Sequence, residues 1–132
     1  MDRKAELTNE WMKKAERDLG MAELALKSKP KYTDLICFHC QQAAEKYLKA
    51  RRGGLIHLEI NFEKTHHLSY LLDLLSDKVV LSNSLYETAE ILDDYAVEVR
   101  YPDDWFEPSK EDAVKAYELA STVKNFVLSK VN

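Results

Sequence analysis

A chain of 132 residues has the length of one domain and enough residues to bury one hydrophobic core. Gly and Pro number only three each and charged residues make up 32%, a composition typical of a helical protein. The net charge of −4 excludes non-specific wrapping of nucleic acid over the whole surface, although it leaves room for a local basic patch. We therefore expect a single helical domain over residues 1–132.

The chain carries none of the common signals for export or membrane insertion. No N-terminal segment has the basic-then-apolar form of a signal peptide, and no apolar run approaches the roughly 20 residues that span a bilayer. Two cysteines exclude a disulfide framework. These features predict a soluble cytoplasmic protein without a membrane partner.

The first predicted helix runs from about Asn9 to Ser28. Its apolar residues recur at steps of three and four, which is the spacing of one helix face: Trp11, Ala15, Leu19, Ala22 and Leu26. We expect Thr8 or Asn9 to cap its start, and Pro30 follows its end.

The second predicted helix begins at about Thr33 and stops at Gly53-Gly54, because glycine tolerates the left-handed conformation of a helix C-cap. One arc of this helix is apolar: Ile36, Cys37, Cys40, Ala43, Ala44, Tyr47, Leu48 and Ala50. The opposite arc carries Gln42, Glu45, Lys46 and Lys49, with Phe38 among them. An aromatic ring in a polar arc indicates either a contact with another chain or one exposed side chain of the ordinary kind.

Residues 55–64 alternate apolar and polar side chains, a period of two that signals an extended segment. Because one strand would have no partner in a helical protein, we expect a connection that lies across the bundle. A short third helix is predicted from His66 to about Ser76, with Thr65 as its N-cap.

The fourth predicted helix spans roughly Ser82 to Arg100 and has the core stripe Leu85, Ala89, Leu92, Ala96 and Val99. It ends there because Tyr101 precedes Pro102 and is pushed out of helical geometry. A fifth helix follows Ser109, with Asp112 at the capping-box position. Its stripe is Ala113, Tyr117, Ala120, Val123 and Val127. The pattern predicts an all-α fold, an up-and-down antiparallel bundle of four long helices plus one short helix.

Cys37 and Cys40 have the spacing of zinc and redox motifs, and both lie on one helix face. A structural zinc site needs about four ligands, and His66 and His67, as neighbours on a helix, point about 100° apart. Both thiols also fall in the apolar arc, where buried cysteines are normal. We therefore predict core cysteines, and neither a metal nor a cofactor.

Arg100 lies seven residues after Asp93, so both lie on one edge of the fourth helix's core stripe. A structural tie to Asp93 at the helix C-terminus would explain the arginine. Phosphate recognition is the alternative, since a planar guanidinium suits phosphate and the neighbouring Tyr101 could stack a base. Lys46 and Lys49 belong to a second basic cluster, whose plainer role is to solvate a helix end.

Three segments of the chain together resemble the HEPN family. Residues 38–50 read Phe-His-Cys-Gln-Gln-Ala-Ala-Glu-Lys-Tyr-Leu-Lys-Ala, residues 65–68 read Thr-His-His-Leu, and residues 100–103 read Arg-Tyr-Pro-Asp. Similar segments occur in that family in this order, and the first motif is the most specific. The resemblance implies a helical bundle that forms a homodimer and binds nucleotides or RNA. It also implies a minimal nucleotidyltransferase as partner, in a toxin–antitoxin or two-part enzyme system.

The chain departs from the nuclease members of that family, in which a histidine four to six residues after an arginine cleaves RNA across the dimer cleft. No histidine follows Arg100 in this window, and metal-free cleavage needs an acid or base poised near neutrality. We therefore expect a non-enzymatic nucleotide- or RNA-binding module. The candidate ligand-binding residues are Arg100, Tyr101, Lys46 and Lys49, and the candidate dimer-interface residue is Phe38. A metal-independent RNase toxin that uses Arg100 with an unidentified acid or base is the alternative, and a helical scaffold without a ligand is the third reading.

Overall fold

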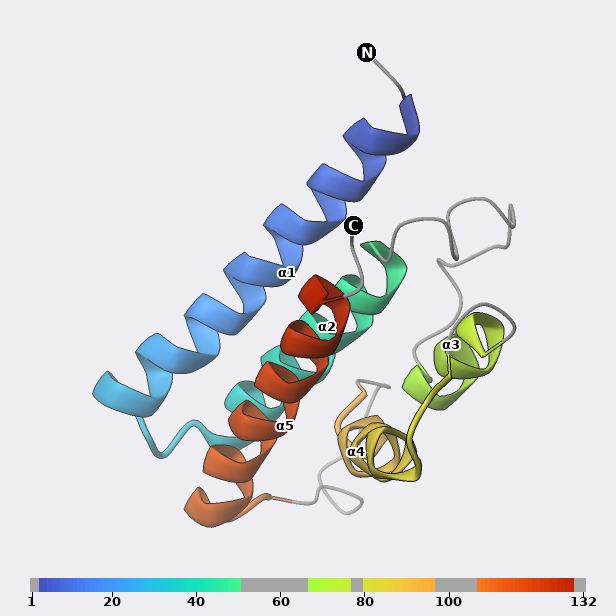
Figure 1. Cartoon of the computed structure of the whole chain (residues 1–132). Coiled ribbons are helices and arrows are strands. Elements are labelled where there is room, and N and C mark those ends of the chain that lie inside the picture. The colour runs from blue at the N-terminus through green and yellow to red at the C-terminus, as the bar shows by residue number, and fades with distance from the viewer. Residues whose placement is uncertain (1–2, 51–66, 77–79, 97–106, 130–132) are drawn as a thin grey trace.

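A computed structural model describes residues 3–50, 67–76, 80–96 and 107–129 of the chain. Across these residues the protein consists of helices and contains no strand, which confirms the predicted all-α class. The helices are α1 (Arg3–Ser28), α2 (Thr33–Ala50), α3 (Leu68–Leu75), α4 (Asn83–Asp93) and α5 (Lys110–Ser129). Figure 1 shows α1 running antiparallel to α2 and α5, with the shorter α3 and α4 beside them. None of these helices is both long enough and apolar enough to cross a membrane.

The first helix begins six residues earlier than the predicted Asn9, at Arg3. Residues 3–7 are good helix formers, and the Arg3 guanidinium lies 3.4 Å from the Glu6 carboxylate one turn along. Thr8 is therefore a buried residue inside the helix and not its cap. The predicted apolar stripe is confirmed, since Ala15, Leu19 and Ala22 are buried in the core.

The central element of the fold is α2, which contacts each of the four other helices. Its predicted apolar arc is confirmed, because all eight residues are fully buried: Ile36, Cys37, Cys40, Ala43, Ala44, Tyr47, Leu48 and Ala50. The most extensive packing of α2 is against α1, and the turn between the two helices is short. The two helices therefore form an antiparallel hairpin (Figure 1).

The start of α3 is set by another helix. His67 holds its N-cap position, so the predicted cap at Thr65 is wrong, and the His67 side chain forms no capping hydrogen bond. Instead, Asp93 of α4 accepts hydrogen bonds from the backbone N–H of Leu68, at 2.6 Å, and from the Ser69 hydroxyl, at 3.0 Å. The carboxylate satisfies donors that a helix N-terminus leaves without partners.

The fourth helix begins as predicted, with the Ser82 hydroxyl accepting from the Leu85 N–H at 3.1 Å, but it ends at Asp93 and not at Arg100. The next three N–H groups donate to carbonyls three residues back, which tightens the chain into a turn. Ala96, a residue of the predicted core stripe, is buried although it lies beyond the end of α4. The apolar spacing therefore predicted the burial of this residue correctly but not the length of the helix.

The fifth helix starts with the predicted capping box. The Ser109 N–H donates to Asp112 at 2.9 Å, and the Asp112 N–H donates to the Ser109 hydroxyl at 3.0 Å. The buried face of α5 is Ala113, Ala116, Ala120, Val123 and Val127. Tyr117 is only partly buried and reaches α1, where its hydroxyl donates to Glu23 at 2.9 Å.

Candidate functional site on the polar face of α2

The polar arc of α2 is largely withdrawn from solvent. Glu45 is 3% exposed and Lys49 is 2% exposed, although both were assigned to the arc opposite the core. Gln41, between the two arcs, is fully buried. Polar side chains that leave water need partners in the protein, so the contacts of this arc decide what it can do.

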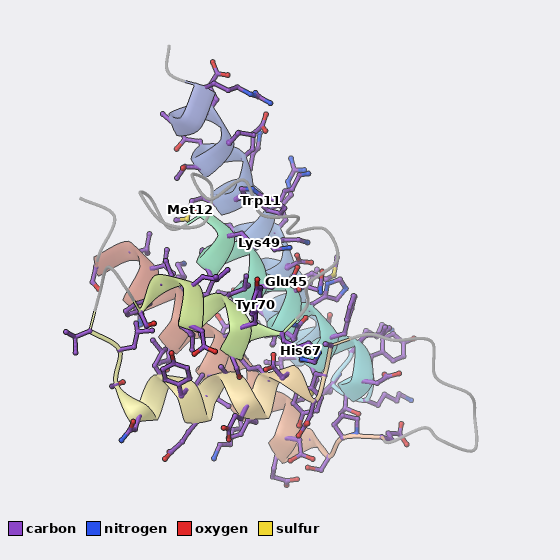
Figure 2. All side chains as sticks on the ribbon, turned by 90° about the vertical axis from the view of Figure 1, so that its right-hand side faces the viewer. Trp11, Met12, Glu45, Lys49, His67 and Tyr70 are labelled. Atoms are coloured by element: carbon purple, nitrogen blue, oxygen red, sulfur yellow. The ribbon has the colours of Figure 1, made fainter. Side chains whose placement is uncertain are left out.

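Glu45 and Lys49 form a buried ion pair one turn apart, with the ammonium nitrogen 2.8 Å from a carboxylate oxygen. The same ammonium lies 5.3 Å from the ring centroid of Trp11 on α1 (Figure 2). The carboxylate and the aromatic face together stabilise a charge that burial would otherwise penalise. The pair therefore links the end of α2 to the first half of α1.

The second ionic contact is built around Asp18 of α1. One of its oxygens lies 2.9 Å from His39 Nδ1, and the other accepts a hydrogen bond from the Lys46 ammonium group. His39 and Lys46 are seven residues apart and therefore share a face of α2. Asp18 was missed in the sequence, where the only signal was its position beside the buried Leu19.

The Asp18–His39 pair has a chemical capability beyond packing. With a hydrogen on Nδ1, the imidazole donates to Asp18 and leaves Nε2 free to accept a proton. The His39 side chain is 31% exposed, so solvent or a ligand can reach it. A carboxylate-oriented imidazole of this kind is suited to general acid–base work.

The two amides complete the network. The Gln42 side chain donates to Gln41 at 2.9 Å and approaches Glu45 at 3.5 Å. Every polar residue of the Gln-Gln-Ala-Ala-Glu-Lys stretch, residues 41–46, therefore contacts another side chain of the domain. The motif organises the junction of α1 and α2 from within.

Phe38 lies at the edge of this network. It is partly buried, and its ring centroid lies 5.3 Å from that of His39 with the planes tilted by 56°. Leu35, one turn earlier on the same face, is 52% exposed, and Tyr32 just before the helix is 49% exposed. Three apolar side chains thus follow one another at helical spacing, and none of them is fully buried.

Comparison with known proteins agrees with this architecture. The family model of the HEPN domain matches residues 8–131. The chain belongs to the HEPN family. This HEPN domain is also similar to the crystal structure of TT1696 from Thermus thermophilus, with 29% identity, a TM-score of 0.78, and coverage of 98% of this chain and 99% of that one. A second crystal structure, of ST0689, an archaeal HEPN homologue, shares 29% identity at a TM-score of 0.73, with both chains covered completely. No curated protein matches the chain significantly.

The cysteines of the HEPN domain are core residues, as predicted. Cys37 and Cys40 are fully buried, and burial is the main cause that raises the pKa of each thiol to about 12. At neutral pH both therefore remain neutral thiols, which are poor metal ligands and poor nucleophiles. No group of three or more His, Cys, Asp or Glu residues in the described ranges is placed to hold a metal ion.

Of the four predicted ligand-binding residues of the HEPN domain, two lie in the α1–α2 network and two lie outside the described residues. Lys46 and Lys49 both lie in the α1–α2 network, and the Lys46 side chain is the more accessible, at 22% exposed. Arg100 and Tyr101 lie outside the described residues, as do Gly53-Gly54 and the segment 55–64. Asp93, the sequence partner suggested for Arg100, uses both oxygens at the start of α3.

Proposed function

We propose that this HEPN domain is a non-enzymatic module that forms a homodimer and binds nucleotide or RNA phosphates. The observation that carries the proposal is that the polar side chains of the family motif, residues 41–46, bind other side chains of the same domain. Its charged groups, Glu45 and Lys46, are each compensated by another side chain of the domain. A motif used in this way supports a rigid platform for binding.

Dimerisation is supported by the open apolar face at the start of α2. Tyr32, Leu35 and Phe38 expose apolar surface beside one another, and the core of a homodimer interface is richer in such surface than the rest of a protein. The face lies next to the Asp18–His39 contact, so a second copy would bring two of these polar networks near each other.

Phosphate binding is proposed for Arg100, with Tyr101 as the stacking group and the partly exposed Lys46 as a supporting cation. Lys49 is buried against Glu45, so its ammonium does not reach a phosphate. A guanidinium makes a two-pronged contact with a phosphate, which an ammonium cannot reproduce. In line with its family, we propose that the domain works with a minimal nucleotidyltransferase in a toxin–antitoxin-type system.

The test is a binding titration with ATP and with a fluorescent single-stranded RNA. Arg100→Ala should weaken binding by about 1.5–3 kcal/mol, the range for hydrogen bonds to charged groups, and Arg100→Lys should recover only part of the loss. Arg17→Ala, at an exposed position of α1, is the matched control for the loss of one positive charge. Equal weakening by Arg17→Ala and Arg100→Ala would show that the net charge, and not Arg100, governs binding.

The Asp18–His39 pair favours one alternative function, a metal-independent RNase that uses Arg100 together with His39. In that case the wild-type protein should cleave RNA in the presence of EDTA, and both Arg100→Ala and His39→Gln should abolish cleavage. We expect no cleavage. Sustained turnover that disappears in both variants would replace the binding module by the nuclease.

A further inference from the structure

His39 connects the polar network of α2 to the apolar face at the start of that helix. Leu35 and His39 are four residues apart and therefore lie on one side of α2. The ring centroids of Phe38 and His39 are 5.3 Å apart. The His39 side chain is 31% exposed and Leu35 is 52% exposed. A second copy that covers Leu35 and Phe38 therefore also covers His39.

The charged groups around His39 come from α1 and α2. Asp18 of α1 contacts His39 Nδ1 at 2.9 Å with one oxygen, and its other oxygen accepts a hydrogen bond from the Lys46 ammonium group. Lys14 lies one turn before Asp18 on the same side of α1 and adds a further positive charge there. Asp34, five residues before His39, points to a different side of α2. The immediate neighbours of the imidazole are thus a carboxylate and an ammonium group whose charges cancel.

The other helices supply no charged partner for His39 within the described ranges. Although α3, α4 and α5 also pack against α2, none of them gives His39 a hydrogen bond or an ion pair there. The network of Asp18, His39 and Lys46 is therefore neutral as a whole while the imidazole is neutral. It carries a single positive charge once the imidazole takes up a proton.

Protonation of His39 has a different consequence in a homodimer than in a single copy. Inside one copy, an imidazolium keeps its hydrogen bond to Asp18, so this contact is preserved in either charge state. A two-fold dimer buries the same patch of both copies, so both imidazoles gain their charge within one interface. Like charges in one interface cost free energy, and the surrounding apolar side chains exclude the water that would screen them. Acid therefore favours the separated copies.

We propose that His39 makes the homodimer sensitive to pH: two copies associate while the imidazole is neutral and separate when it takes up a proton. In the dimer, His39 donates the hydrogen on Nδ1 to Asp18, and Nε2 carries no hydrogen. Among side chains, histidine is the one that ordinarily changes charge between about pH 5 and about pH 8. The inference rests on the homodimer proposed above and adds its control.

The first experiment is sedimentation equilibrium of the full chain at about pH 8 and at about pH 5.5, at one ionic strength. We expect the copies to associate about tenfold more weakly at the lower pH, with an unchanged helical signal in circular dichroism. Equal affinity at the two pH values would overturn the proposal, and so would dissociation that occurs only together with unfolding. A wild-type protein that is monomeric at both pH values refutes the homodimer itself, and the proposal falls with it.

The second experiment uses variants. His39→Asn keeps a side-chain N–H that can donate to Asp18 but takes up no proton, so this variant should dimerise equally well at both pH values. His39→Lys is charged at both pH values, so it should dimerise about tenfold more weakly than the wild type at about pH 8. The matched control is His67→Asn, at an exposed position where the histidine side chain forms no capping hydrogen bond. This control should keep the full pH dependence.

The variants decide the question in either direction. Loss of the pH dependence in His39→Asn, with His67→Asn unchanged from the wild type, supports the proposal. A pH dependence that persists in His39→Asn overturns it, and so does tight dimerisation of His39→Lys at both pH values. Loss of the pH dependence in His67→Asn would also overturn it, because the effect would then not be specific to His39.

Discussion

The carboxylate of Asp93 lies 2.6 Å from the backbone nitrogen of Leu68 and so caps a helix that begins 25 residues earlier in the chain. The contact joins the end of α4 to the start of α3. It replaces the local cap that His67 fails to provide, and it makes the stability of one short helix depend on the other.

Replacing Asp93 should therefore destabilise the domain. Asp93→Ala removes the acceptor for the Leu68 N–H and the Ser69 hydroxyl, and should lower the free energy of unfolding by about 1–2 kcal/mol, as the loss of a helix N-cap does. Urea denaturation measures the change. Glu90→Ala, at an exposed position of the same helix, should stay within about 0.5 kcal/mol of the wild type.

Breaking the buried ion pair should cost more than breaking a surface pair. Glu45→Gln leaves the Lys49 ammonium buried without its carboxylate, so the free energy of unfolding should fall by about 3–5 kcal/mol. The double variant Glu45→Gln/Lys49→Met should lose less than the sum of the two single changes, because no buried charge is then left alone.

The control for this cycle is the exposed pair of Arg3 and Glu6, where Glu6→Gln should change the stability by less than about 1 kcal/mol. Additive losses at Glu45 and Lys49 would contradict the coupling that the 2.8 Å contact implies.

Disruption of the apolar face at the start of α2 should separate the proposed dimer. Leu35→Glu places a charge on a side chain that is 52% exposed, so the monomer should fold normally while the interface is lost. Light scattering at micromolar concentrations should give twice the chain mass for the wild type and a single chain mass for the variant. Val114→Glu on α5, another exposed apolar position, should remain a dimer. A wild-type protein that is monomeric at every concentration would refute the proposal.

Alkaline conditions should destabilise the domain through its buried thiols. The pKa of Cys40 rises from 9.0 in the unfolded chain to about 12 in the fold, so the folded state holds this proton more tightly. The corresponding stability is fully present below about pH 9 and is lost as the pH rises from about 9 to about 12.

Urea denaturation at pH 8 and at pH 10.5 tests this dependence. Cys40→Ala lowers stability at both pH values because it removes a buried side chain, but its further loss between them should be smaller than that of the wild type. Cys37, Tyr47 and Tyr95, whose pKa values are each raised to about 12, contribute a remaining loss that both proteins share.

Much of the fold was predictable because its signals are local. The Ser109–Asp112 capping box involves residues three positions apart, and both of its hydrogen bonds form as predicted. The apolar arc of α2 follows from a period of 3.6 residues, and each of its members is fully buried. Membership of the HEPN family was likewise visible in the motif of residues 38–50.

What the tertiary structure alone decided is which polar groups meet. Asp18 reaches His39 and Lys46 across two helices, and Asp93 reaches back to α3. A polar residue at a helix edge has the same local sequence whether it faces water or another helix. Its burial and its partners depend on how distant segments pack. The periodicity of α2 therefore predicted which residues face the core, but it could not predict the burial or the partners of the polar residues.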